Sequence, residues 1–360
     1  MKMPSLTTSL PLLCALVPCL AAQTAAAQSP SSDVDASVAP APAPVLSVQA
    51  PPAGVDASAA PPGPAVIAAQ PPPPKAPYSI PFQLRPAAAV TVMRADTSFG
   101  MYDDPAAPSA DGTAIVSTLL GSYKLTDNIV PLVRMGMVSN SPPGSAEGAV
   151  GFLNPVVGAS YILPLTPELR FAGFFGLALP FGSGGGDTPN AAKAAANAAG
   201  IRARSAMDNA LFAVNDVALL PGVGLAYVAH GFTLQAEATL VQLFRARGEG
   251  ARNAAGAQIN PDSSRTNFTA GLHAGYFIYP ELSVAAELRH QRWLSTPRAI
   301  ANDATGTLRD TTTVALGPRV HFKLGDKAWI RPALALALGL DDPQQRWESK
   351  SVQLDIPVIF

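Results

Sequence analysis

The sequence has few charged residues and few long apolar runs, and each shortage excludes some classes of protein. Only 14% of its 360 residues are charged, whereas soluble domains carry about 25%, so the chain must bury its surface or turn it towards lipid. The net charge of −1 indicates no nucleic-acid partner. Beyond the N-terminal region, no run approaches the roughly 18 apolar residues of a membrane-spanning helix.

Cysteine is confined to a predicted secretory signal. Cys14 and Cys19 are the two cysteines, and they lie in an apolar stretch that follows Lys2 and precedes a cluster of alanines. These features predict a signal peptide over residues 1–27, so the processed chain would hold neither a disulfide nor a cysteine metal site. A lipoprotein box ending at Cys19 is the alternative, which Pro18 disfavours.

Aromatic residues are missing from residues 28–77, which consist largely of proline and alanine. Such a segment buries too little apolar surface to fold, and its prolines favour an extended polyproline conformation. We therefore predict a disordered tether or spacer, with a proline-rich docking ligand as the alternative.

From residue 78 onwards, apolar residues recur at every second position. The last ten residues show this best, since Val352, Leu354, Ile356, Val358 and Phe360 alternate with Ser351, Gln353, Asp355, Pro357 and Ile359. Alternate residues of a strand point to opposite faces. One face here is large and apolar and the other small or charged, which is typical of a lipid-facing wall around a polar lumen. Residues 78–360 are therefore predicted to form an all-β, antiparallel transmembrane barrel of about twelve strands, the first over residues 80–97.

Prolines within the expected strands argue against this interpretation, because each removes a hydrogen bond from the ladder. The eight positions are Pro86, Pro131, Pro155, Pro180, Pro221, Pro318, Pro332 and Pro357.

Short turns alternate with longer loops, as expected for the two rims of an outer-membrane barrel. An aromatic residue of lipid-facing parity precedes each short turn, namely Tyr123, Tyr161, Tyr227, Tyr276 and Phe322. These residues predict an aromatic girdle at the periplasmic face of the membrane.

The terminal Phe360, with Val352, Leu354, Ile356 and Val358, resembles the C-terminal signature of Gram-negative outer-membrane barrels. The resemblance implies location in the outer membrane, contact with lipid and lipopolysaccharide, and recognition by the barrel-assembly machinery. It is specific for location and architecture and indicates no particular transport family.

Strand parity assigns more cations than anions to the lumen. The predicted lumen residues are Arg85, Lys124, Arg134, Arg170, Arg289, Arg319, Lys323 and Arg331, with Glu237, Glu287, Asp355 and His321. A cationic lumen favours anions in a pore. The alternative is a charge network that fills and stiffens a narrow barrel.

The longest loop, residues 182–214, contains an alanine-rich stretch that predicts a helix. Asp187 or Thr188 would cap it, Pro189 would begin it and Gly200 would follow its end. This loop would either fold into the mouth as a constriction or lie outside the rim.

Enzyme motifs are weak. The sequence contains neither G-x-S-x-G nor H-E-x-x-H, although Ser283 and His321 share lumen-facing parity near one rim. We therefore expect no catalytic, cofactor or metal site. The favoured function is a passive channel or porin for small solutes, and a structural or adhesin-like barrel is the alternative.

Overall fold

The computed structural model describes residues 77–360, apart from 105–106, 254, 260, 303–308 and 343. The predicted signal peptide and residues 28–76 of the predicted tether lie outside the described residues. The elements are β1 Val92–Asp104, β2 Ala107–Ser122, β3 Ile129–Ser141, β4 Ala149–Phe152, β5 Val156–Pro164, β6 Leu169–Ala178, α1 Ala191–Ala203, α2 Asn209–Phe212, β7 Asp216–Ala229, β8 Phe232–Arg245, β9 Ser264–Tyr279, β10 Leu282–Trp293, α3 Arg298–Ala301, β11 Asp310–Val320, β12 Phe322–Leu324, β13 Ala328–Ile330, β14 Ala333–Gly339 and β15 Lys350–Ile359.

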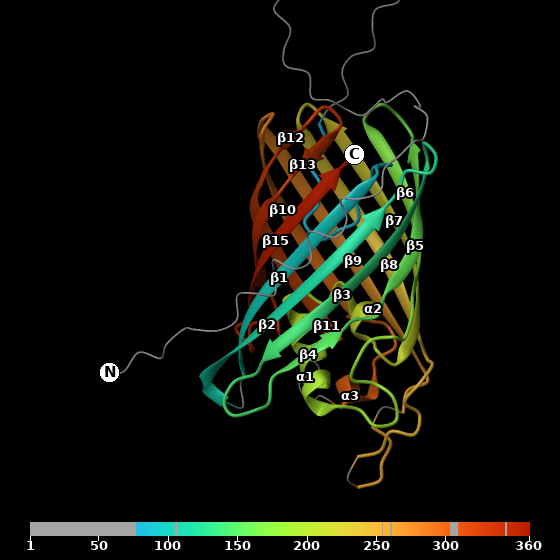
Figure 1. Cartoon of the computed structure of the whole chain (residues 1–360), viewed down its shortest axis with the longest axis vertical. Coiled ribbons are helices and arrows are strands. Elements are labelled where there is room, and N and C mark those ends of the chain that lie inside the picture. Colours follow the sequence, from blue (N-terminus) through green and yellow to red (C-terminus); the bar gives the residue numbers. More distant parts are fainter. Residues whose placement is uncertain (1–76, 105–106, 254, 260, 303–308, 343) are drawn as a thin grey trace, which may run out of the picture. The chain divides into compact units, whose positions relative to one another are not determined.

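The strands form one antiparallel sheet that closes on itself (Figure 1). β1 pairs with β2 on one side and with β15 on the other, from Val92 opposite Ile359 to Met101 opposite Lys350. The pairs β4 and β5, β11 and β12, and β13 and β14 are each one interrupted strand, so the described part of the chain builds a barrel of twelve strands. The predicted antiparallel barrel is confirmed.

The alternation in the sequence determines which side chains face outwards. In β15 the side chains of Gln353 and Asp355 are buried inside, whereas their even-numbered neighbours line the outer wall. Phe152, Leu316 and Leu334 are 68%, 63% and 52% exposed on that wall. A closed barrel with a large apolar outer surface is the architecture of a protein that crosses a membrane with strands.

The eight prolines are accommodated in three ways. Four lie outside the regular strands: Pro86, Pro155, Pro180 and Pro332. Within the strands, the ladder between β7 and β8 skips Leu220 and Pro221, and that between β11 and β14 skips Gly317 and Pro318. Pro131 and Pro357 keep their register, opposite Ala159 and Arg94. The missing N–H groups therefore leave at most local gaps, and the closed sheet is not broken.

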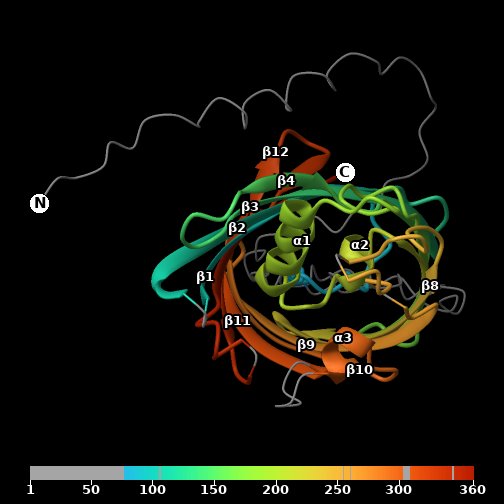
Figure 2. The same cartoon turned by 90° about the horizontal axis from the view of Figure 1, so that it is seen from below.

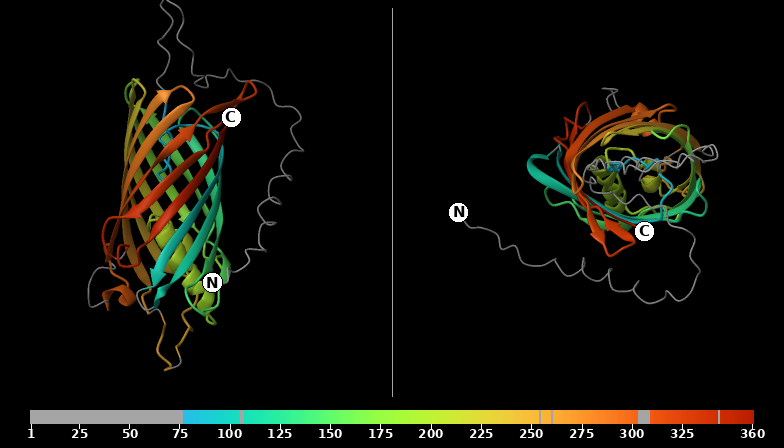
Figure 3. Two further views of the ribbon diagram at one scale, coloured as in Figure 1. Left: turned by 90° about the vertical axis from the view of Figure 1, so that its left-hand side faces the viewer. Right: turned by 90° about the horizontal axis from the view of Figure 1, so that it is seen from above.

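The first strand begins at Val92, so the prediction of a strand over residues 80–97 is wrong. Residues 77–91, here called the inserted segment, lie within the ring of strands (Figure 3). Ser79, Phe82 and Leu84 are buried there, with exposed fractions of 2% or less. The alternation of Ile80, Phe82 and Leu84 imitates a strand. Pro81, however, lacks the N–H donor that a ladder requires, and wall side chains bind this backbone instead.

The longest loop also enters the barrel, where α1 and α2 lie inside the ring (Figure 2). Of the two alternatives, the constriction is therefore correct. Asn190 caps α1, not Asp187 or Thr188, because its side-chain oxygen accepts a hydrogen bond of 2.8 Å from the Lys193 amide. Gly200 lies within α1, where a Cβ would come within 2.5 Å of the Phe212 ring. No helix in the described ranges is long and apolar enough to cross a membrane.

Candidate functional site: the occupied lumen

The lumen half nearest the long loops contains an apolar core. Ala196, Ala199 and Ala203 of α1 pack against a wall that includes Val116 and Val138, all with exposed fractions of 1% or less. Alanine lets the helix approach the wall closely. Because apolar burial contributes about 25 cal/mol per Å², this insertion is a firmly held part of the fold.

The other half holds the inserted segment through polar contacts. Its amide groups donate to wall side chains: Ser79 to Thr233 at 2.9 Å, Arg85 to Glu237 at 2.7 Å, and Phe82 to Glu287. Gln83 also donates to Glu287. The wall therefore satisfies N–H groups that would otherwise be buried without partners.

The carbonyl groups of the segment are also satisfied by the wall. Arg94 donates to the carbonyl oxygens of Pro81 and Phe82, the first at 2.9 Å. Gln235 donates to the Arg85 carbonyl oxygen at 2.7 Å, and Arg331 reaches that of Tyr78. The segment thus lies in a polar cradle built from strands far apart in the sequence.

Phe82 occupies an apolar pocket within this cradle. Its ring packs against Ala285, Ala333 and Ala335 and is 1% exposed. The Arg319 guanidinium carbon lies 5.6 Å from the ring centroid, within cation–π range.

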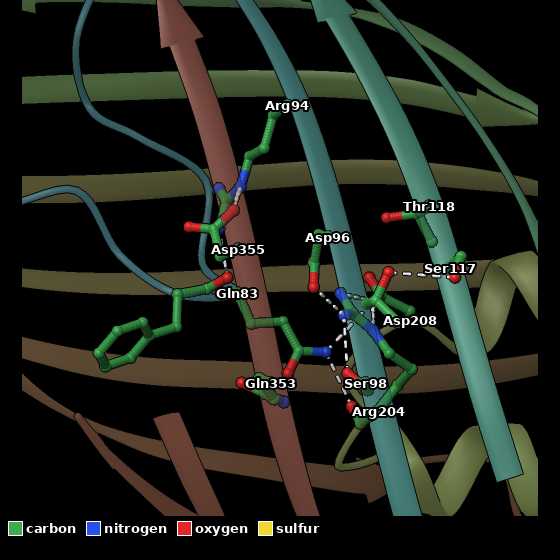
Figure 4. A network of polar contacts seen from close by, with 12 residues as sticks. Gln83, Arg94, Asp96, Ser98, Ser117, Thr118, Arg204, Asp208, Gln353 and Asp355 are labelled. Carbon is green, nitrogen blue, oxygen red and sulfur yellow. Dashed lines mark hydrogen bonds and ion pairs between the residues drawn. The ribbon is translucent and has the colours of Figure 1, made fainter. Parts of the chain in front are cut away.

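Asp355 joins the cradle to the closing strands (Figure 4). It accepts from Arg94 of β1 at 2.6 Å and from Arg319 of β11 at 2.5 Å. Because both arginines also contact the segment, the ion pairs and the cradle form one network.

Arg204, between α1 and α2, forms a second network (Figure 4). Its guanidinium lies 2.8 Å from Asp96 and 2.8 Å from Asp208, and Arg134 pairs with Asp208 at 2.8 Å. Burial opposes the charge of Asp208, but attraction to Arg134 and Arg204 outweighs it and lowers the pKa of this carboxyl. Gln83 donates to the Arg204 carbonyl oxygen at 2.8 Å, so the two insertions touch.

The predicted lumen residues divide into three groups. Those that the wall turns inwards are Arg134, Arg170, Glu237, Glu287, Arg289, Arg319, His321, Arg331 and Asp355. Arg85 lies in the lumen but on the inserted segment. Lys124 and Lys323 were assigned wrongly: both are exposed at the short-turn rim, because β2 ends before Lys124 and Lys323 lies in the β12–β13 hairpin.

Four charged residues of the networks were missed. The predicted first strand, residues 80–97, had Arg85 facing the lumen. Arg94 and Asp96 are even-numbered and Arg85 is odd-numbered, so the same strand would have turned these two side chains towards lipid. The alternation of Met93, Phe99 and Met101 with buried polar residues was the available signal. Arg204 and Asp208 are on an inserted loop, for which strand parity gives no information.

The cations of the lumen are extensively paired in this conformation. Arg289 lies 2.8 Å from Glu287 and Arg85 lies 2.6 Å from Glu237. This pairing favours the stiffening network over a freely accessible cationic surface.

Ser283 and His321 meet, with 2.9 Å between Ser283 Oγ and His321 Nε2. The His321 ring stacks on Phe277, and its Nδ1 has no hydrogen-bond partner among the described residues. A catalytic triad requires an acid at that nitrogen, so the observed pair lacks the orienting partner. Across the described residues, no three metal-ligating side chains cluster.

The predicted girdle and signature residues lie on the outer wall. The five girdle rings are between 41% and 61% exposed, and Phe360 is 52% exposed at the end of the closing strand. Their roles at the membrane interface and in assembly stay predictions.

A closed antiparallel barrel with an apolar outer wall and an occupied lumen defines a transmembrane β-barrel protein. No protein-family model and no curated protein matches the chain. Among solved structures, it is similar to the NanC porin (14% identity, 74% of this chain and 98% of that one, TM-score 0.42). It is also similar to the β domain of the Bordetella autotransporter BrkA (11% identity, 75% and 100%, TM-score 0.42). At sequence identities this low, the similarity is one of barrel architecture alone.

Proposed function

We propose that this protein is a gated outer-membrane channel for small solutes, and that the inserted segment is its gate. The α1–α2 insertion narrows the lumen permanently from the long-loop end. The inserted segment closes the short-turn end, which would face the periplasm.

The observation that supports this proposal is the difference between the two insertions. The α1–α2 insertion is packed in an apolar core, whereas the inserted segment combines hydrogen bonds to wall side chains with the burial of three apolar side chains, those of Ile80, Phe82 and Leu84. Water can replace such bonds, so each contributes only about 0.5–3 kcal/mol net, with the larger values for bonds to charged groups. The segment also precedes β1, and the one backbone bond seen from it to the end of the closing strand is at its last residue, where the Thr91 carbonyl oxygen accepts from the Phe360 amide at 3.1 Å. The residues before Thr91 would therefore leave without breaking the sheet.

A disulfide tests the gate directly. The Leu84 Cγ atom lies 3.2 Å from the place where a Cβ at Gly271 would stand, so cysteines at both positions would be within disulfide reach. We expect the Leu84→Cys/Gly271→Cys variant to be silent in planar bilayers when oxidised and to show unitary conductance steps when reduced.

The single variant Leu84→Cys is the matched control, and its conductance should not respond to oxidant or reductant. Stable conductance from a fully crosslinked double variant would contradict the gate. Silence of the reduced, correctly folded protein would favour the structural or adhesin-like alternative.

An anion preference is proposed for the open state. The charged wall side chains seen to contact the inserted segment are Arg94, Arg170, Arg319, Arg331, Glu237 and Glu287. Arginine outnumbers glutamate in this set, although Asp355 offsets part of the excess. Departure of the segment would remove its carbonyl groups from Arg94 and Arg331 and leave a cationic path.

Reversal potentials in a salt gradient measure this preference. Replacing Arg170 and Arg331 with Gln should weaken anion selectivity, because the fields of nearby charges act within a Debye length of about 8 Å at physiological salt. Lys323→Gln removes an exposed rim cation and is the control, with little expected change. Cation selectivity of the unmodified pore would contradict the anion preference.

A further inference from the structure

We propose that the wall around the inserted segment is a binding site for extended peptides, that residues 77–91 are its resident occupant, and that peptides of the same chemistry displace them. This inference rests on the proposed channel function and names the class of solute that opens it.

The wall recognises main-chain groups more than side chains. Thr233, Glu237 and Glu287 accept from amide groups of the segment, while Arg94 and Gln235 donate to its carbonyl groups. Every residue of a peptide other than proline presents this same pair of groups. Recognition through them therefore tolerates many sequences, as in other proteins that bind extended peptides.

The wall also leaves room for a chain to lie against it. A Cβ at Gly271 would come within 2.4 Å of Leu84, and a Cβ at Gly275 would come within 2.1 Å of Ser79. Both glycines are on β9, directly beneath the segment. The space left by their missing side chains is filled by the side chains of Leu84 and Ser79, so the segment lies close against this part of the wall.

One pocket selects a side chain. Alanine occupies the inward positions 285, 333 and 335, and these small residues make the space that the Phe82 ring fills. Pro81 precedes Phe82 and favours an extended backbone at this point. Proline has no N–H, and the wall contacts Pro81 through its carbonyl oxygen alone among the hydrogen bonds seen. The preferred ligand is thus an extended, proline-containing peptide with one aromatic residue.

The resident occupant does not satisfy the whole site. Neither ring nitrogen of His273 has a hydrogen-bond partner in the described structure, although Nδ1 lies 3.5 Å from Glu287. The Ser79 hydroxyl above it is also unsatisfied, and both residues are fully buried. Unsatisfied buried polar groups weaken binding of the resident segment, which favours its exchange for another peptide.

The test uses the full chain and a fluorescent synthetic peptide of sequence 77–91. The tethered segment competes at an effective concentration in the millimolar range, so the chain variant Phe82→Ala weakens the competitor while leaving the wall intact. We expect this variant to bind the peptide at least about tenfold more tightly than the unmodified chain, measured by anisotropy in detergent.

Three controls separate main-chain recognition from nonspecific adhesion. A peptide N-methylated at Phe82, Gln83 and Arg85 loses the amide donors and should not bind. A peptide with Gln83→Ala keeps the backbone and the aromatic ring and should bind. Adding Ala335→Leu to the Phe82→Ala chain fills the aromatic pocket and should abolish binding.

The disulfide variant Leu84→Cys/Gly271→Cys supplies a second measurement should Phe82→Ala not fold. Its oxidised form should exclude the peptide, and its reduced form should bind it. Absence of binding to both the Phe82→Ala and the reduced chains, or binding that survives N-methylation, would overturn the peptide site. Gated conductance would then still stand. Conductance of the oxidised double variant would overturn the gate, and silence of the reduced, folded barrel would overturn the channel itself.

Discussion

Arg204 is the central cation of the ion-pair network around the α1–α2 insertion. It is fully buried and contacts Asp96 and Asp208, while Ser98 accepts a further hydrogen bond from it at 3.1 Å. The residues that follow, Ser205 and Ala206, have positive φ angles of 55° and 54°, a conformation that side chains rarely adopt. The strained turn therefore exists because the ion pairs and the apolar core around it hold both helices in place.

We expect Arg204→Met to lower the free energy of unfolding by about 3–5 kcal/mol, because it leaves two buried carboxylates without their main cation. Urea unfolding in detergent micelles measures this change. Arg298→Met removes an exposed arginine from α3, and its effect should stay within about 0.5 kcal/mol. Equal effects of the two substitutions would show that the Arg204 network adds no stability.

At the scale of elements, much of the barrel was predictable, because a period of two on a closed sheet fixes which side chains face lipid. The β15 strand shows this, since every residue from Ser351 to Ile359 has the predicted facing. The inserted segment was not predictable. Ile80, Phe82 and Leu84 alternate as they would in a strand. Pro81 and Pro86 argue against a strand, but prolines also occur in the true strands, so the absence of a pairing partner is what distinguishes the two structures. The Arg204 network was also missed, because it depends on contacts between residues that are distant in the sequence.

We predict that the end of the closing strand, β15, is needed for assembly. Phe360 ends β15, and its outward ring matches the assembly signature, so Phe360→Lys should block insertion of the exported protein. Heat-modifiable migration on electrophoresis measures insertion. Phe322→Lys is a matched control, because Phe322 is 53% exposed and Phe360 52%, but Phe322 lies outside the signature. Normal insertion of the Phe360→Lys protein would refute the assembly role.

For the whole molecule, we expect a protease to cut at the boundary between the predicted tether and the barrel. Residues 28–77 are predicted from composition to be cleavable, whereas Ser79 and Ile80 are buried in the lumen. Limited proteolysis of the exported protein should therefore leave a resistant fragment that begins near Tyr78, as identified by mass spectrometry. Cleavage between residues 79 and 90 in an intact barrel would show that the segment does not rest in the lumen.

The position of the inserted segment also constrains the order of assembly. β1 and β15 are the two strands that meet to close the sheet, and the segment is joined directly to β1. Arg94 of β1 and Asp355 of β15 pair across this seam, and Arg94 also binds the carbonyl groups of Pro81 and Phe82. A segment that is already in place would orient the Arg94 side chain that β15 must meet, and we expect it to act as an internal template for ring closure. Variants that weaken the segment should accordingly slow the final step of folding more than they lower the stability of the finished barrel.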